Sequence, residues 1–163
     1  MQFTIRQATI GDAPVIAQYN INMAKETEGI DLDPDTILKG CEAILERDDE
    51  ACFSNNPKGF YLVAVDTATI IGQLMITYEW SDWRNAVVWW IQSVYVLPEY
   101  RGKGVFKSLY QHVKQMCIDN KGVGLRLYAD TGNINAQNTY RKLGMSSHYL
   151  VFEDLFDDES ATP

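Results

Sequence analysis

The residues between positions 97 and 106 combine a turn, positive charge and glycines in front of a helix. A strand-like apolar run ends at Pro98, and Arg101-Gly102-Lys103-Gly104 then leads into a helical pattern that begins near Gly104. The first amides of a helix have no partner within it, and the helix dipole favours negative charge there. Glycines let a ligand approach the main chain, and two basic side chains add positive charge to an otherwise acidic protein. The segment therefore predicts an anion site, most naturally for a diphosphate.

Two well-known phosphate-binding motifs do not describe this loop. A Walker A loop needs Gly-Lys-Ser/Thr four residues after a first glycine, and this loop has no such sequence. The dinucleotide fingerprint needs a third glycine, which Gly102-Lys103-Gly104 lacks. Taken alone, the loop fits equally well with a glycine-rich turn whose charges are incidental.

The rest of the sequence predicts the elements that must hold this loop. Apolar runs and period-two alternation predict strands, and apolar residues at helical spacing predict helices. Asp12, two residues before Pro14, and Asp33, directly before Pro34, mark helix starts, and Gly144 marks a helix end. Strands are expected at residues 3–6, 60–65, 70–78, 86–96, 125–128 and 149–152, and helices at 12–25, 33–47, 104–120 and 134–143.

The predicted order β-α-α-β-β-β-α-β-α-β alternates only in its second half. This predicts a mixed α/β fold with one central sheet and helices on both faces. No repeat or linker divides the 163 residues. One domain over residues 1–152 is therefore expected, followed by an acidic C-terminal tail over residues 153–163.

The composition of the chain excludes some classes of function and favours others. Lys and Arg number 14 against 22 Asp and Glu, and the resulting net charge of −8 argues against nucleic acid and suits a cationic partner. No apolar run reaches the roughly 18–20 residues of a membrane span, and Met1-Gln2-Phe3-Thr4-Ile5-Arg6 is not typical of a signal peptide. The three cysteines show no disulfide or metal-ligand spacing. We therefore expect a cytoplasmic protein without a metal.

The segment that holds the loop resembles the phosphate-binding motif of the GNAT superfamily of acyl-CoA-dependent N-acetyltransferases. The family pattern is Arg/Gln-x-x-Gly-x-Gly/Ala after a strand ending Val-x-Pro, and Val94-Tyr95-Val96, Arg101 and Gly104 match it. Phe106 departs from the pattern, which has glycine or alanine there. We expect its ring to point into the core, because it shares one helical face with Leu109 and Val113.

A second stretch resembles another signature of this family, Asn-x-x-Ala-x-x-x-Tyr followed by Gly-Phe. Asn133, Ala136, Tyr140 and Gly144 match it, with Met145 in place of phenylalanine. The opening Ile5-Arg6-Gln7-Ala8-Thr9, followed by Asp12 and Ala13, is also typical of the family's first strand and helix, and the resemblance spans residues 3–152. It implies a mostly antiparallel central sheet, acetyl-CoA as co-substrate and acetyl transfer to an amine.

The resemblance also implies roles for individual residues. The strand Val94-Tyr95-Val96 would part from the next strand and pair with the pantetheine amides. Asn133 would bind the pantetheine arm, or would simply cap its helix. Tyr140 would protonate or hydrogen-bond the departing thiolate, or would only pack on the coenzyme. The residues expected around the diphosphate are Arg101, Gly102, Lys103, Gly104, Val105 and Phe106.

Acetyl transfer also needs a neutral amine and hence a proton acceptor. Glu79 is the first candidate for this base, followed by Asp82 and Glu26, although each could be a solvated acid. Acids and indoles suit a cationic amine, while Trp80 and Trp83 could instead lie in the core or at a dimer interface, and Arg84 could bind a substrate carboxylate. The residues expected on the acceptor side are Glu26, Glu28, Trp80, Asp82, Trp83 and Arg84.

These residues predict an N-acetyltransferase that acts on a primary amine of a small molecule or peptide. Transfer would be direct, because no cysteine occupies a motif position that could carry the acyl group. A homodimer is expected. The alternatives are a non-catalytic acyl-CoA-binding or regulatory domain and an interaction module that dimerises through exposed tryptophans.

Overall fold

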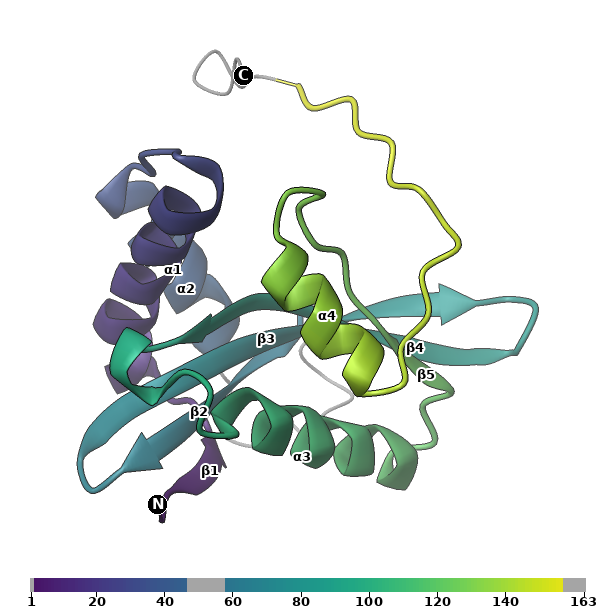
Figure 1. Ribbon diagram of the computed structural model, residues 1–163, viewed down its shortest axis with the longest axis horizontal. Coiled ribbons are helices and arrows are strands. Elements are labelled where there is room, and N and C mark those ends of the chain that lie inside the picture. The colour runs from purple at the N-terminus through teal and green to yellow at the C-terminus, as the bar shows by residue number, and fades with distance from the viewer. Residues whose placement is uncertain (1, 47–57, 157–163) are drawn as a thin grey trace.

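The computed structural model describes residues 2–46 and 58–156, and its centre is one five-stranded sheet (Figure 1). The strands lie in chain order across the sheet, with β1 to β4 antiparallel and β5 parallel to β4. This confirms the predicted mixed, mostly antiparallel sheet. The strands are β1 (Thr4–Gln7), β2 (Phe60–Asp66), β3 (Thr69–Ser81), β4 (Ala86–Val96) and β5 (Gly124–Arg126).

Four α-helices surround the sheet, and their starts follow from local chemistry. The Asp33 carboxylate accepts a hydrogen bond from the Thr36 amide at 2.8 Å, and Pro34 occupies the first turn, where no amide donor is needed. Asp12 precedes the first helix as expected, but its carboxylate is bound by Arg6 and the Thr9 amide and makes no side-chain cap to that helix. The helices are α1 (Ala13–Glu28), α2 (Pro34–Leu45), α3 (Val105–Asp119) and α4 (Ile134–Lys142), with short 3₁₀ turns at Ile10–Asp12 and Pro98–Tyr100.

The side chains of alternate strand residues point into two separate hydrophobic cores. Phe60 and Leu62 of β2 join Leu109 and Val113 of α3 on one face of the sheet. Tyr61 and Val63, between them in sequence, join residues of α1 and α2 on the other face. Helices therefore cover both faces, as the sequence predicts. No helix in the described part of the chain is long and apolar enough to cross a membrane.

A bulge bends β4 immediately before its last residues. Gln73 of β3 pairs with Tyr95 of β4, and Met75 pairs with Gln92. Between these two pairs, β4 therefore contains one residue more than β3. Ser93 lies in this stretch with a φ of 50°, in the left-handed region that side chains rarely adopt. The bulge thus changes the direction of the main chain at Val94–Val96.

One predicted strand is wrong. Residues 149–152 form no strand but an extended coil whose apolar side chains are 58–89% exposed. A strand needs a neighbour with which to share hydrogen bonds, and this segment pairs with no strand of the described chain. The preceding strand, β5, is also shorter than the expected 125–128. Residue 47, where the second helix was expected to fade, lies outside the described residues.

Candidate active site

A cavity of about 660 Å³ opens between α1, β4 and α4. Its wall includes the residues that the sequence assigned to the pantetheine arm and the thiolate. Among the predicted coenzyme residues it brings together Val94, Tyr95, Val96, Arg101, Phe106, Asn133 and Tyr140. Gly102, Lys103, Gly104 and Val105 are not part of this wall; they form the turn into α3, and the Val105 side chain is buried in the core.

The cavity exists because β4 and β5 part. The two strands pair only from Val88 with Gly124 to Trp90 with Arg126, whereas β4 continues to Val96. From Ile91 onward, no described strand pairs with the β5-facing side of β4. Apart from the Val96 carbonyl oxygen, which accepts a hydrogen bond from Arg101, the main-chain groups of Val94–Val96 on this side can therefore pair with an extended ligand that carries amides.

The loop between β4 and α3 has the geometry of an anion site. Gly102 and Gly104 adopt positive φ values of 73° and 86°, and neither position would crowd an added Cβ. The glycines therefore serve the backbone conformation. Gly104 immediately precedes α3, so the free amides at the start of a 15-residue helix face the loop.

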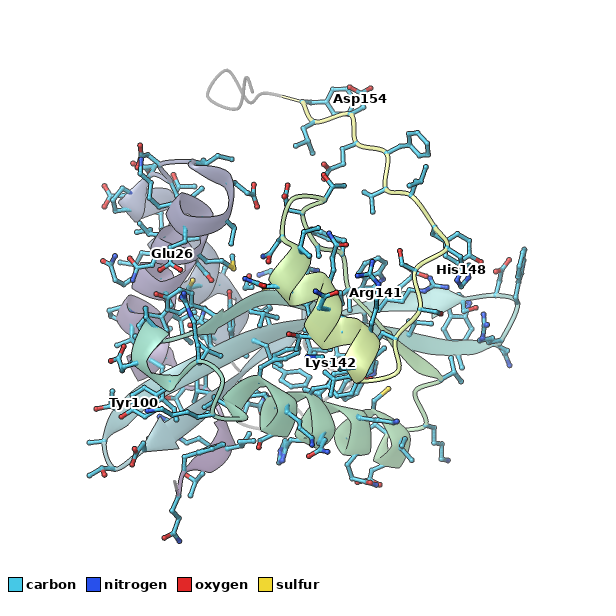
Figure 2. The ribbon with its side chains drawn as sticks, in the orientation of Figure 1. Glu26, Tyr100, Arg141, Lys142, His148 and Asp154 are labelled. Atoms are coloured by element: carbon cyan, nitrogen blue, oxygen red, sulfur yellow. The ribbon has the colours of Figure 1, made fainter. Side chains whose placement is uncertain are left out.

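Arg101 ties this loop to both β4 and α1. Its Nε donates to the carbonyl oxygen of Val96 at 2.8 Å, and its Nη2 donates to Oε2 of Glu26 at 2.7 Å. The guanidinium also lies over the Tyr95 ring, 5.3 Å from the centroid, while the Tyr95 hydroxyl donates to the other Glu26 oxygen at 3.1 Å. Figure 2 shows Glu26 on the α1 helix that flanks the cavity. Glu26 thus orients the cation of the predicted diphosphate site.

The Phe106 ring contacts both the hydrophobic core and the cavity. Its ring is partly buried against the α3 core, which agrees with the expected inward orientation. The same ring also lines the cavity and meets Tyr140 edge to face at a centroid distance of 5.6 Å. The large residue at this position therefore lies against the Tyr140 ring.

Helix α4 carries the remaining two motif residues. The Asn133 side chain accepts a hydrogen bond from the Ala136 amide at 3.1 Å, so it caps the helix while also lining the cavity. Burial raises the pKa of Tyr140 above its ordinary value of 10.0. The Tyr140 hydroxyl therefore stays protonated at neutral pH, as a proton donor must.

Glu79 lies outside the cavity wall, on the sheet face opposite α3. Side chains on one face alternate along a strand; Thr77, Trp90 and Arg126 each fall between two residues of the α3 core, and Glu79 follows Tyr78 of that core. The Glu79 carboxylate accepts a hydrogen bond from Trp90 Nε1 at 2.7 Å and forms an ion pair with Arg126. Sequence reasoning missed Arg126, although its position between two core leucines was a signal.

The remaining predicted acceptor residues do not reach the cavity wall. Trp80, Asp82, Trp83 and Arg84 lie at the end of the β3–β4 hairpin, where the Trp80 and Trp83 side chains are 61% and 89% exposed. Glu28 is exposed at the end of α1. Of the predicted acceptor residues, only Glu26 lines the cavity.

A buried polar cluster under the β4 bulge escaped sequence reasoning. Asn20 of α1 accepts a hydrogen bond from Gln73 Nε2 at 2.9 Å and donates to the Tyr61 hydroxyl at 3.1 Å. The side chains of Asn20 and Gln73 are almost fully buried. Burial, and secondarily the nearby Cys41 thiol, raise the pKa of Tyr61 to about 12. The cluster joins α1 to β2 and β3 directly beside the bulge.

Comparison with known proteins identifies the family to which this fold belongs. Residues 27–145 match the model of the Acetyltransferase (GNAT) family. The chain belongs to this family.

Relatives and solved structures support the same assignment. The chain is 30% identical over 77 residues to a streptothricin acetyltransferase of Escherichia coli (47% of this chain, 41% of that protein), and 28% identical over 75 residues to a thialysine N-ε-acetyltransferase of Bos taurus (46% and 44%). It thus spans less than half the length of these relatives. A possible acetyltransferase from Clostridium difficile 630 is 43% identical, with a TM-score of 0.82 over 96% of this chain and 99% of that one. A predicted acetyltransferase from Clostridium acetobutylicum, solved with acetyl-CoA, shares the fold at 16% identity, with a TM-score of 0.73 over 93% and 96% of the two chains.

Proposed function

We propose that this protein transfers the acetyl group of acetyl-CoA to a primary amine of a small molecule or peptide. The observation that carries this proposal is the parting of β4 from β5, which leaves the main chain of Val94–Val96 along one wall of the cavity. Arg101 and the start of α3 lie beyond one end of that strand, and Tyr140 faces it from α4. A diphosphate, an amide-bearing arm and a thioester fit this arrangement in that order.

The coenzyme is held by main-chain groups and one cation. The amides from Gly102 to Phe106 bind the diphosphate, and Arg101 adds a charge-assisted contact. The pantetheine arm pairs with Val94–Val96 as an added strand, and Asn133 supports it from the start of α4.

The chemistry follows from placing the thioester next to Tyr140. The neutral amine attacks the carbonyl carbon, an N–C bond forms, and the C–S bond breaks. The departing sulfur receives its proton from Tyr140, and the proton that the attacking nitrogen loses as the amide forms restores the Tyr140 phenol, directly or through water. A lysine-like amine has a pKa of about 10.4, so neutralising it at pH 7 costs about 4.6 kcal/mol, and a carboxylate must accept the proton directly or through water.

We assign this proton to Glu79 and place the acceptor amine on the open sheet face beside it. Glu26 is hydrogen-bonded to Arg101, at the proposed diphosphate end of the cavity. Glu79 instead lies on β3 and accepts a hydrogen bond from Trp90 of β4, which precedes the bulge. Acid and indole together suit a cationic amine. The relatives named as streptothricin and thialysine acetyltransferases support an amine acceptor.

The working form of the protein is, in this proposal, a cytoplasmic homodimer. Cys41 and Cys117 are buried free thiols, which suits a reducing compartment. The β3–β4 hairpin and the C-terminal segment expose large apolar side chains, which suits self-association.

Release of free thiol from acetyl-CoA across a panel of primary amines tests the activity. We expect amine-dependent release, and we expect Tyr140→Phe to lower kcat at least tenfold with little change in acetyl-CoA affinity, because only the proton donor is lost. Coenzyme binding without release for any amine would favour the non-catalytic alternative. Equal rates for Tyr140→Phe and the unaltered protein would remove the acid role of this residue.

A further inference from the structure

Two opposite charges lie side by side on the sheet face opposite α3. Glu79 of β3 and Arg126 of β5 form an ion pair across β4, the strand between them. Trp90 of β4 pairs with Arg126 in the register of the sheet, and its indole Nε1 donates to the second Glu79 oxygen at 2.7 Å. The indole therefore fixes the carboxylate of Glu79 beside the guanidinium of Arg126.

One edge of the Arg126 guanidinium remains available to a ligand. Among the residues that the structure describes, only Nη1 of Arg126 has a hydrogen-bond partner, which is Glu79. Nε and Nη2 together form the edge of a guanidinium that can bind both oxygens of a carboxylate. The Arg126 side chain is 37% exposed, so a ligand can reach this edge. The cluster thus offers paired donors to an anion and a carboxylate to a cation.

The stability of the fold does not account for this ion pair. Both side chains are more than one-third exposed, and ion pairs that are this open to water contribute little to the free energy of unfolding. Leu125 and Leu127, on either side of Arg126, pack against the α3 core, so the guanidinium points to the opposite face. The α1 and α2 core on that face lies over β2 and over the end of β4 beyond the bulge. Figure 1 shows α1 and α2 at one end of the sheet, with the β3–β4 hairpin extending away from them.

The charged pair lies beside the strand that leads to the coenzyme cavity. Trp90 and Gln92 are two residues apart on β4, so their side chains share one face about 7 Å apart. Gln92 adjoins the bulge at Ser93, and Val94 beyond the bulge lines the cavity. An acceptor bound at Trp90 is therefore next to the place proposed for the thioester.

We propose that the acceptor is an amino acid, whose carboxylate binds the available edge of Arg126 and whose α-ammonium group lies against Glu79. This inference rests on the proposed acetyl transfer and names its substrate class. One carbon separates the amine of an amino acid from its carboxyl group, so its two charges are about as close together as those of the ion pair. Glu79 takes a proton from the ammonium group, and the neutral nitrogen then attacks the thioester. An amine without a carboxylate would use Glu79 alone.

Matched acceptors test the substrate class. Each amino acid is compared with the amine that lacks only its carboxylate, such as phenylalanine with phenethylamine and leucine with isopentylamine. We expect at least one amino acid to exceed its partner amine about tenfold or more in kcat/KM, measured by thiol release from acetyl-CoA. No such preference for any amino acid would overturn the proposal while acetyl transfer stands.

Substitution of Arg126 tests the residue. Arg126→Gln should lower kcat/KM for the preferred amino acid about tenfold and change that for its partner amine less than about twofold. Arg126→Lys, which keeps the charge without the paired donors, should retain part of the preference and replaces Arg126→Gln if that variant does not fold. The control is Lys121→Gln, which removes an exposed positive charge before β5 and should leave the preference unchanged.

Two results with the variants would also overturn the proposal. One is a preference that survives Arg126→Gln, and the other is a preference that Arg84→Gln removes instead, which would move the carboxylate site to the β3–β4 hairpin. If no amine releases thiol, the proposed acetyl transfer fails, and calorimetric titration of amino acids into the protein saturated with CoA decides about the site. Binding that Arg126→Gln abolishes supports it, whereas absent or unchanged binding overturns it.

Discussion

The ring of Phe106 meets the ring of Tyr140 edge to face, with 5.6 Å between their centroids. Phe106 lies in the first turn of α3, behind the loop proposed to bind the diphosphate, and Tyr140 carries the hydroxyl proposed to protonate the coenzyme sulfur. In the proposed mechanism, the contact therefore lies between the coenzyme-binding loop and the acid. It also explains how a large residue fits at a position where the family pattern has a small one: the ring packs against Tyr140 and the core.

Phe106→Ala should separate these two roles. Loss of a partly buried ring and of an aromatic pair should lower the free energy of unfolding by about 2 kcal/mol. The value of kcat should fall severalfold because Tyr140 loses its support, while the acetyl-CoA dissociation constant should change less than about threefold because the binding amides remain. Denaturant titration, steady-state kinetics and calorimetry measure the three quantities. Phe106→Leu, which keeps apolar volume without a ring, is the matched control; a tenfold loss of coenzyme affinity in Phe106→Ala would contradict this division.

Arg101→Met should weaken coenzyme binding. The substitution removes the charge-assisted contact proposed for the diphosphate and leaves the Glu26 carboxylate without its 2.7 Å partner. We expect about a tenfold rise in the dissociation constant of CoA, equivalent to about 1.4 kcal/mol. Calorimetric titration provides the measurement, with Lys114→Met on the exposed side of α3 as the control for lost positive charge. Unchanged binding in Arg101→Met would show that the guanidinium serves only the contact between α1 and β4.

Glu79→Gln should slow acetyl transfer without weakening coenzyme binding. The substitution keeps the shape of the side chain and removes the proposed proton acceptor, so kcat/KM for the amine should fall about 100-fold at neutral pH. The deficit should shrink as pH rises toward the pKa of the amine, because free base then becomes abundant. A pH profile of thiol release tests this, with Glu46→Gln at the exposed end of α2 as the control. If kcat/KM were lowered by the same factor at all pH values, Glu79 would not be the proton acceptor and would serve only in its ion pair with Arg126.

Tyr61 should make the protein lose stability in alkali. Its folded pKa of about 12 lies above the ordinary value of 10.0, so the unfolded chain releases this proton first as pH rises. The free energy of unfolding should therefore include this contribution in full below pH 10 and lose roughly 2–3 kcal/mol of it between pH 10 and 12. Denaturant titrations at a series of pH values measure the decline, and Tyr61→Phe should remove this part of it. An identical decline in both proteins would assign it to other groups.

Local sequence was sufficient to predict most of the elements, because their signals are local. The hairpin, the long β4 run and the caps at Asp33 and Gly144 depend on neighbours in the chain. The prediction of a strand at residues 149–152 was wrong because it depends on more than local sequence. Its side chains favour a strand, but a strand also needs a partner edge, which sequence periodicity does not provide.

The same distinction holds at the site. The two motifs identified the cavity wall, since each carries its residues within one turn or one helix. The positions of Trp80 and Trp83 depend on how far β3 and β4 extend, and the observed hairpin carries them away from the cavity. The Glu79–Arg126 pair and the Asn20–Gln73 cluster join residues far apart in sequence, so no local pattern could predict them.

A crystal structure of the full chain with acetyl-CoA tests the central claim most directly. We predict the diphosphate on the amides of residues 102–106, the pantetheine arm paired with Val94–Val96, and the coenzyme sulfur within hydrogen-bonding distance of the Tyr140 hydroxyl. A coenzyme bound elsewhere, or a loop closed to it by the Phe106 ring, would contradict the account.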